Sequence, residues 1–217
     1  MPHESGVVFI VEDDAELRQS IVSLLERGGS TCRSFESARA FLAAYEPQQP
    51  GCLVLDIRLP GMSGLELQRE LKARETGLPV IVISGYGDVQ IVVESMQLGA
   101  VDFIEKPFQT QSLLDAVHRA LASDLRNRSR IEDQRRQRAR LNALTERERL
   151  VVDLVVSGLT NKAIARRLNV SSQAIDARRA NAMAKLGVEN LAQLIRFALL
   201  AERQDGSEGR SSANHPS

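Results

Sequence analysis

The sequence has few cysteines and no long apolar run. Only two of its 217 residues are cysteine, Cys32 and Cys52, and they lack the spacing of metal ligands. We expect both to be small core residues in or beside strands. No apolar stretch approaches the roughly 20 residues that cross a bilayer, and no secretory segment is visible at the N-terminus. We therefore expect a cytoplasmic protein without a membrane partner.

The chain also lacks net charge, because 28 basic residues balance 28 acidic ones. This balance is uneven along the sequence. Residues 1–125 contain 10 Lys or Arg and 18 Asp or Glu, a net charge of −8, whereas residues 126–202 contain 16 and 8, a net charge of +8. Such asymmetry predicts an acidic domain joined to a basic one that can approach a polyanion.

Polar residues directly follow four short apolar runs in the first half of the sequence. Short apolar runs separated by helix-length segments are typical of buried parallel strands, and ligands of such sheets bind beyond the strands' carboxyl ends. Carboxylates crowded there repel one another unless a cation is present, so the cluster predicts a hard divalent ion such as Mg²⁺. The residues are Glu12 and Asp13 after run 7–11, Asp56 after 52–55, Ser84 after 80–83 and Lys106 after 102–105.

A further strand at 31–35 and five amphipathic segments complete the pattern of the first half. Five strands that alternate with five helices favour an α/β domain with a doubly wound parallel sheet, because right-handed crossovers place helices on both faces. The helical segments are predicted at 14–27, 37–45, 63–73, 88–98 and from about 112 onward.

From about residue 7 to about 121 the chain resembles the receiver domain of two-component response regulators, a five-stranded flavodoxin-like fold. The resemblance implies that Asp56 accepts a phosphoryl group from a sensor histidine kinase. It also implies that Mg²⁺ is held by Asp13, Asp56 and the backbone carbonyl of Arg58, while Glu12 orients a metal-bound water. The motifs that carry it are Glu12-Asp13, Asp56 followed by 59–64, Ser84-Gly85 and Lys106-Pro107-Phe108.

The chemistry of phosphoryl transfer requires these residue types, since it needs an in-line nucleophile and positive charge near the equatorial oxygens. Asp56 is the predicted nucleophile, Lys106 and Mg²⁺ supply positive charge, and Ser84 donates a hydrogen bond to the attached group. By resemblance, Lys106-Pro107 is a cis peptide and Phe103 swings inward when Ser84 moves toward the phosphate. The plainer alternatives are a strand-end cap for Ser84, a solvated lysine for Lys106 and a core aromatic for Phe103.

The same resemblance predicts where the receiver responds to phosphorylation. The switched surface would comprise the helix at 88–98, the strand at 102–105 and the helix that starts near 112. Many relatives use this surface for dimerisation, so we expect a homodimer in the phosphorylated state.

An arginine-rich segment follows, with seven arginines between 126 and 140 and only Glu132 and Asp133 to offset them. It is compatible with a DNA-contacting arm, but a solvated, partly helical linker is favoured. The predicted domains are a receiver at 1–122, a charged helical linker at 123–142, a DNA-binding domain at 143–202 and a disordered tail at 203–217.

Helix signals resume after the arginine-rich segment. Thr145 and Glu148 have the spacing of a capping box ahead of the apolar run 150–156, which Gly158 ends. Thr160 caps a helix at 161–168, a third helix runs from 171 or 172 to about 186, and a fourth from about 190 to 201. Two short helices joined by a tight turn, the second rich in Arg and Asn, indicate a small all-α helix-turn-helix domain.

Residues 144–200 resemble the LuxR-type DNA-binding domain, and its pairing with a receiver resembles the FixJ/NarL class. The strings that carry this resemblance are 144–148, 158–165 and Lys185-Leu186. It implies contacts with double-stranded promoter DNA: Lys162 at phosphates, Asp176, Ala177 and Ala180 toward the groove, and Arg178, Arg179 and Asn181 beside it.

The recognition segment departs from the family pattern at Gln173, Ala174-Ile175 and Arg178, so the target sequence does not transfer. Asp176 has two interpretations. Near phosphates it is repelled unless it accepts from a cytosine amino group or pairs with Arg178 or Arg179 in its own helix.

Together these features predict a phosphorylation-dependent transcription regulator and not an enzyme. A metal-dependent phosphotransferase or phosphatase is one alternative, but it would require a second general acid two residues after Asp56, where Arg58 stands. A signal adaptor whose second domain binds protein is another, and the +8 charge of residues 126–202 argues against it.

Overall fold

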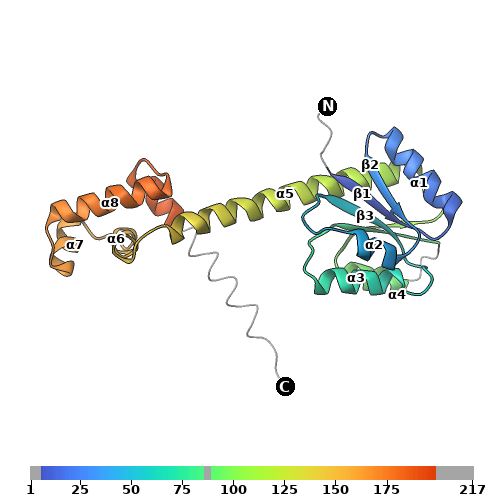
Figure 1. Ribbon diagram of the computed structural model, residues 1–217, viewed down its shortest axis with the longest axis horizontal. Coiled ribbons are helices and arrows are strands. Elements are labelled where there is room, and N and C mark those ends of the chain that lie inside the picture. Colours follow the sequence, from blue (N-terminus) through green and yellow to red (C-terminus); the bar gives the residue numbers. More distant parts are fainter. Residues whose placement is uncertain (1–5, 86–88, 199–217) are drawn as a thin grey trace, which may run out of the picture. The chain divides into compact units, whose positions relative to one another are not determined.

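The computed structural model describes residues 6–85 and 89–198, and the chain divides into two compact units, Met1–Ser129 and Arg130–Ser217. The first unit contains a five-stranded parallel sheet with strand order β2-β1-β3-β4-β5 (Figure 1). This confirms the predicted doubly wound sheet. Its strands are β1 (Val7–Val11), β2 (Thr31–Phe35), β3 (Gly51–Asp56), β4 (Val80–Ser84) and β5 (Ala100–Glu105).

The central strands β3 and β4 are buried along their whole length, which explains their continuous apolar runs. The edge strand β2 is only partly buried and accordingly contains polar residues. β3 begins at Gly51, one residue before the predicted run. A Cβ at Gly51 would lie 2.1 Å from the carbonyl oxygen of Val7, so only glycine allows β1 and β3 to approach this closely.

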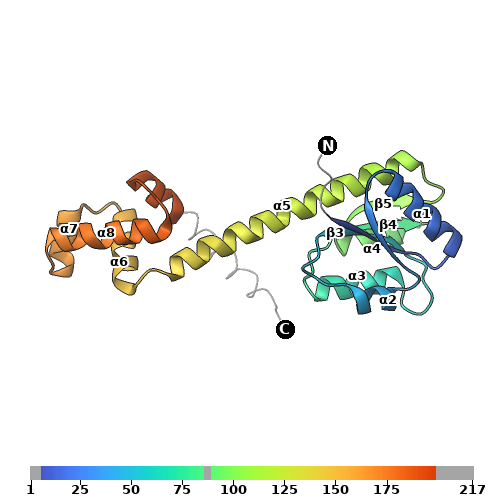
Figure 2. The same ribbon diagram turned by 45° about the horizontal axis from the view of Figure 1, so that its top comes forward.

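Helices cover both faces of the sheet, and each face has its own apolar core. α1 (Ala15–Arg27) and the first turns of α5 (Thr110–Asn142) pack on one face. α2 (Ala38–Ala44), α3 (Gly64–Ala73) and α4 (Val89–Gln97) pack on the other, as Figure 1 and the turned view in Figure 2 show. The sequence predicted all five helices. The bounds of α1 to α4 differ from the predicted ones by at most one residue, and α5 begins two residues before the predicted start near 112.

α5 is a single helix of 33 residues that includes the whole of the predicted linker. Asp124, in its middle, is only 3% exposed. Its Oδ2 accepts from the backbone N–H of Gly51 at 2.9 Å and from Nε of Arg128 at 2.7 Å. The Arg128 guanidinium also donates to the backbone carbonyls of 47, 48 and 49, at 3.0 to 3.1 Å. Arg128 is therefore part of the folded first unit, which corrects the expectation of a solvated charge run at this position.

After the end of α5, the described part of the second unit contains short helices around one apolar core. They are α6 (Glu146–Val156), α7 (Asn161–Leu168), α8 (Ser172–Leu186) and a helix at 191–198. Thr145, Thr160 and Ser171 cap the first three, and Asn169 and Gly187 end α7 and α8 in the left-handed conformation. The helix-turn-helix prediction is confirmed. The predicted end of the fourth helix at 201 and the tail at 203–217 lie outside the described residues.

Within the described residues, every helix is too short or too polar to cross a membrane.

A buried carboxylate ties the helices of the second unit together. Glu148 is 7% exposed and completes the predicted capping box, because its Oε2 accepts from the N–H of Thr145 at 2.8 Å. The same oxygen accepts from Nζ of Lys185, in the last turn of α8, at 2.7 Å. The hydrogen bond from Lys185 and those from Thr145 lower the pKa of Glu148 from 4.5 to about 2.

This shift predicts an acid sensitivity of the second unit. Since folding lowers the pKa of Glu148, its stabilising effect is complete above pH 4.5 and is lost as the pH falls toward 2. Glu148→Gln should remove this component, because the amide does not titrate. Amide hydrogen exchange of α6 to α8, measured in the full-length protein across this pH range, should show a shallower dependence for Glu148→Gln. Glu146→Gln, an exposed neighbour, is the control, and identical profiles for Glu148→Gln and the unmodified protein would contradict the prediction.

Candidate functional site

The polar residues singled out in the sequence meet at the carboxyl ends of four strands. Val11 of β1 is paired in register with Leu55 of β3, so Glu12 and Asp56 are the next residues of adjacent strands. The strand order reverses between these two strands, and such a point opens a crevice in a doubly wound sheet. Ser84 is the last residue of β4, and Lys106 directly follows β5.

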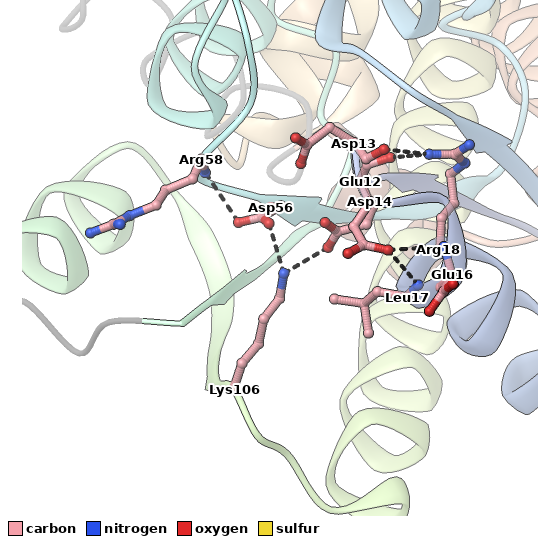
Figure 3. A network of polar contacts seen from close by, with 9 residues as sticks. All are labelled: Glu12, Asp13, Asp14, Glu16, Leu17, Arg18, Asp56, Arg58 and Lys106. Carbon is pink, nitrogen blue, oxygen red and sulfur yellow. Dashed lines mark hydrogen bonds and ion pairs between the residues drawn. The ribbon is translucent and has the colours of Figure 1, made fainter.

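Three carboxylates form the centre of this cluster. Glu12, Asp13 and Asp56 each offer an oxygen, and these oxygens lie within 4.8 Å of one another. Glu12 and Asp56 are buried, whereas Asp13 is exposed. Nζ of Lys106 donates to Oε2 of Glu12 and to Oδ2 of Asp56, both at 2.7 Å (Figure 3). One ammonium does not balance three carboxylates, so the cluster favours a further cation.

The surroundings change the proton affinity of two of these groups. Burial raises the pKa of Glu12, and this effect together with the nearby Asp56 charge outweighs the lowering by the Lys106 hydrogen bond. Burial alone would lower the pKa of Lys106, but its hydrogen bonds to Asp56 and Glu12 outweigh burial and raise it. Lys106 therefore keeps its positive charge beside Asp56 at neutral pH.

The donor set fits a magnesium ion. Mg²⁺ prefers carboxylate and carbonyl oxygens and retains several waters, and the exposed carboxylate of Asp13 leaves one side of the cluster open to solvent. The loop after β3 is close as well, since the N–H of Arg58 donates to Oδ1 of Asp56 at 3.1 Å. Arg58 is the residue whose carbonyl was expected to complete the coordination.

Two functional neighbours were missed in the sequence (Figure 3). Arg18 donates through Nη1 to the carbonyl oxygens of Glu12 at 2.7 Å and of Asp13 at 3.1 Å, and so holds the backbone that carries the acidic pair. Asp14 caps α1, because its Oδ1 accepts from the N–H groups of Glu16 and Leu17, so this carboxylate is engaged at the start of the helix. The cap spacing was available in the sequence, but the contacts of Arg18 with carbonyl groups five and six residues earlier had no local signal.

The residues expected to switch lie next to the cluster. The Lys106-Pro107 peptide is cis, as the resemblance implied. Ser84 is fully buried, and its carbonyl oxygen accepts from the N–H of Lys106 at 2.7 Å. Phe103 is partly buried and packs against the core shared with α2 and α3. Phe103 thus lies on β5, the strand that leads to Lys106 and pairs with β4, which ends at Ser84.

An apolar surface covers α4 and the adjoining part of β5. Val89 is 72% exposed, and Val93, Met96 and Val101 are 46% to 48% exposed. A groove also lies between β5 and α5, lined by residues that include Asp102, Phe103, Phe108, Ser112 and Arg119. This surface coincides with the segments that were expected to respond to phosphorylation.

The second unit presents the residues predicted to meet DNA. Ile175, Ala182 and Leu186 fix one side of α8 in the core. The Asp176 carboxylate has two polar partners in the second unit. Its Oδ1 lies 3.6 Å from Nη2 of Arg179 and accepts a hydrogen bond from Nδ2 of Asn161. The exposed predicted residues are Lys162, Asp176, Ala177, Ala180 and Asn181, and the half-buried ones are Arg178 and Arg179.

Two family models match the chain. The first describes the response regulator receiver domain and matches residues 8–118. The second describes bacterial regulatory proteins of the luxR family and matches residues 142–198. Each match lies largely within one of the two units, and together they span most of the described residues.

Curated proteins and solved structures resemble the chain over most of its length. The transcriptional regulatory protein FixJ of Azorhizobium caulinodans is 44% identical over 199 residues, which is 91% of this chain and 94% of that protein. FixJ of Rhizobium meliloti is 43% identical and covers 88% and 94%, respectively. The structure of response regulator StyR has a TM-score of 0.85 and 39% identity, covering 89% of this chain and 98% of that one. The structure of full-length FixJ from B. japonicum has a TM-score of 0.57 and 37% identity, covering 91% of this chain and 98% of that one.

Proposed function

The chain belongs to the response regulators that join a receiver domain to a LuxR-type DNA-binding domain, and we propose that Asp56 is its phosphoryl acceptor. As a member of this family it is a phosphorylation-dependent transcriptional regulator. The observation that carries the proposal is the cluster of Glu12, Asp13 and Asp56 with Lys106 at the carboxyl ends of the strands.

The residues of the cluster have distinct tasks. Asp56 is the nucleophile toward the phosphoryl group of a sensor histidine kinase, and Lys106 is close enough to neutralise an equatorial phosphoryl oxygen. Asp13, Asp56 and the carbonyl of Arg58 would hold Mg²⁺, and Glu12 would orient one of its waters. When bound, the ion supplies positive charge to the developing oxygens. Arg18 fixes the backbone of the acidic pair, so the carboxylates are oriented before the phosphodonor arrives.

The geometry favours a switch over a turnover enzyme. A phosphatase of the same acidic chemistry would need a general acid two residues after its nucleophile, and Arg58 occupies that position. An arginine side chain offers no carboxylic acid for this step, so the phosphoryl group has no built-in route of departure through this residue.

The attached phosphoryl group would act through Ser84 and Phe103. A phosphorylated receiver changes state only through contacts that differ between its two states. Ser84 moving toward the phosphate would provide such a contact, and Phe103 would follow into the space beside β4. The apolar surface of α4 and β5 would then form a homodimer, which places two helix-turn-helix units on two half-sites of promoter DNA. The domain bounds proposed for this arrangement are 1–122, 123–142 and 143–202.

Ser84→Ala tests the switch. The variant should accept a phosphoryl group at Asp56, because the nucleophile and its charged neighbours remain, but it should fail to dimerise or to gain DNA affinity. Sedimentation and DNA titration after treatment with acetyl phosphate and Mg²⁺ would measure both responses. Ser23→Ala removes a hydroxyl from α1 and should respond like the unmodified protein. Dimerisation of labelled Ser84→Ala at unmodified strength would exclude this route.

A further inference from the structure

A closed ring of three polar side chains links the start of α7 to α8. Asn161, the first residue of α7, donates through Nδ2 to Oδ1 of Asp176. Its Oδ1 accepts from Nη1 of Arg179 at 3.4 Å. Nη2 of Arg179 lies 3.6 Å from Oδ1 of Asp176, so each member of the ring contacts the other two.

The ring leaves most of the arginine fork free for a ligand. Asn161 uses both ends of its amide, the nitrogen toward the carboxylate and the oxygen toward the guanidinium. A guanidinium has five N–H donors in one plane. The ring takes one of them in a hydrogen bond, and the ion pair at 3.6 Å is longer than a hydrogen bond. Arg179 remains 34% exposed, so the other donors can meet acceptors outside the protein.

Stability alone does not account for this arrangement. The Asp176 side chain is 55% exposed, and exposed ion pairs contribute little to folding because water screens them. α7 and α8 are already joined through Ile164 and Ile175, both fully buried. The main physical effect of the ring is therefore to restrict the position of the Arg179 guanidinium.

We propose that Asn161 and Asp176 are positioning residues that hold Arg179 for contact with paired oxygen and nitrogen acceptors of DNA. The inference rests on the proposed function, because it takes α8 as the helix that contacts DNA. Holding the side chain in advance reduces the rotamer freedom lost on binding. Asp176 then acts through Arg179 and does not accept a hydrogen bond from a cytosine amino group. Its negative charge near the DNA phosphates is offset by the Arg179 guanidinium.

The ligand for the test is a duplex selected from a random-sequence library by the full-length phosphorylated protein, together with its single-base variants. Arg179→Ala should weaken binding about 10- to 100-fold. Asn161→Ala and Asp176→Ala should each lose part of the same discrimination, about 3- to 10-fold. If Arg179 contacts a guanine edge, the loss will differ between duplex variants. If it contacts phosphate instead, the loss will be uniform and the salt slope will fall by about one, and the proposed contact with paired oxygen and nitrogen acceptors would be wrong.

A double-mutant cycle separates positioning from independent contacts. Asn161→Ala added to Arg179→Ala should cause no further loss of affinity, because the amide acts only through the arginine. Arg178 is the matched control, since it makes no hydrogen bond or ion pair within the part of the chain that the structure describes. Asn161→Ala and Arg178→Ala should therefore be additive. Additive losses for the Asn161 and Arg179 pair would overturn the proposal.

The remaining outcomes are distinguishable. Weaker binding by Arg179→Ala with unchanged binding by Asn161→Ala would refute the positioning role and leave the DNA-binding function intact. Unchanged affinity for both Arg178→Ala and Arg179→Ala would instead show that α8 does not enter the groove. Asn161→Asp serves as a second variant if Asn161→Ala unfolds, because it keeps an acceptor for Arg179 while repelling Asp176; it should lose discrimination as well.

Discussion

Replacing Asp56 with Asn is expected to abolish phosphorylation of the protein by acetyl phosphate in Mg²⁺. The amide of asparagine is a poor nucleophile and carries no charge for the metal, although it keeps the size of the side chain. The other carboxylates do not substitute for Asp56. Glu12 has a raised pKa and is engaged by Lys106, and exposed Asp13 lacks that lysine contact in the described structure. Intact-mass measurement of the treated protein would detect the added phosphoryl group.

Two further variants make the result specific to the site. Asp13→Ala should still be labelled, but only at a sharply higher Mg²⁺ concentration, because the ion loses a direct ligand. Asp115→Asn removes an exposed carboxylate from α5 and should be labelled normally. Equal labelling of Asp56→Asn and the unmodified protein would place the acceptor elsewhere.

The sequence predicted that these side chains lie together, because parallel strands bring their carboxyl ends to one edge of the sheet. Once 7–11, 52–55, 80–83 and 102–105 are recognised as strands, the residues that follow them are neighbours, whatever their separation in the chain. The periodic helices and their caps were equally accessible, since capping depends on residues three or four apart. Helix ends such as those of α3 and α8 are therefore local properties of the sequence.

Side-chain contacts that depend on how one element packs against another carried no such signal. Arg18 is an ordinary helical arginine in the sequence, and only the packing of α1 beside β1 brings it to the carbonyls of Glu12 and Asp13. The amide of Asn161 likewise meets α8 only after the helix-turn-helix forms. The sequence predicts a solvated run at Arg128 because its neighbours are arginines, yet its partners are backbone carbonyls 79 to 81 residues away. Charge density along the sequence does not show which of several arginines has such partners.

Breaking the buried pair of Asp124 and Arg128 should therefore be among the most destabilising single changes in the first unit. The Asp124 carboxylate is 4% exposed, and Arg128 provides its only cationic partner among the described ion pairs. Arg128→Ala leaves this charge buried with one backbone N–H from Gly51, and should destabilise the first unit by about 3–5 kcal/mol. Hydrogen exchange of the β1 and β3 amides in the full-length protein would measure the loss, because those central strands open only when the unit unfolds.

Two further replacements, one at an exposed ion pair and one that makes the buried pair apolar, test whether burial determines the size of this effect. Arg136 also pairs with an acidic residue one turn away, Glu132, but its side chain is 68% exposed. Arg136→Ala should cost less than about 0.5 kcal/mol, because water already solvates both charges. Replacing Asp124 and Arg128 together by leucine should recover much of the loss from Arg128→Ala, since no buried charge then remains. A cost for Arg128→Ala as small as that for Arg136→Ala would mean that water, and not Arg128, neutralises Asp124.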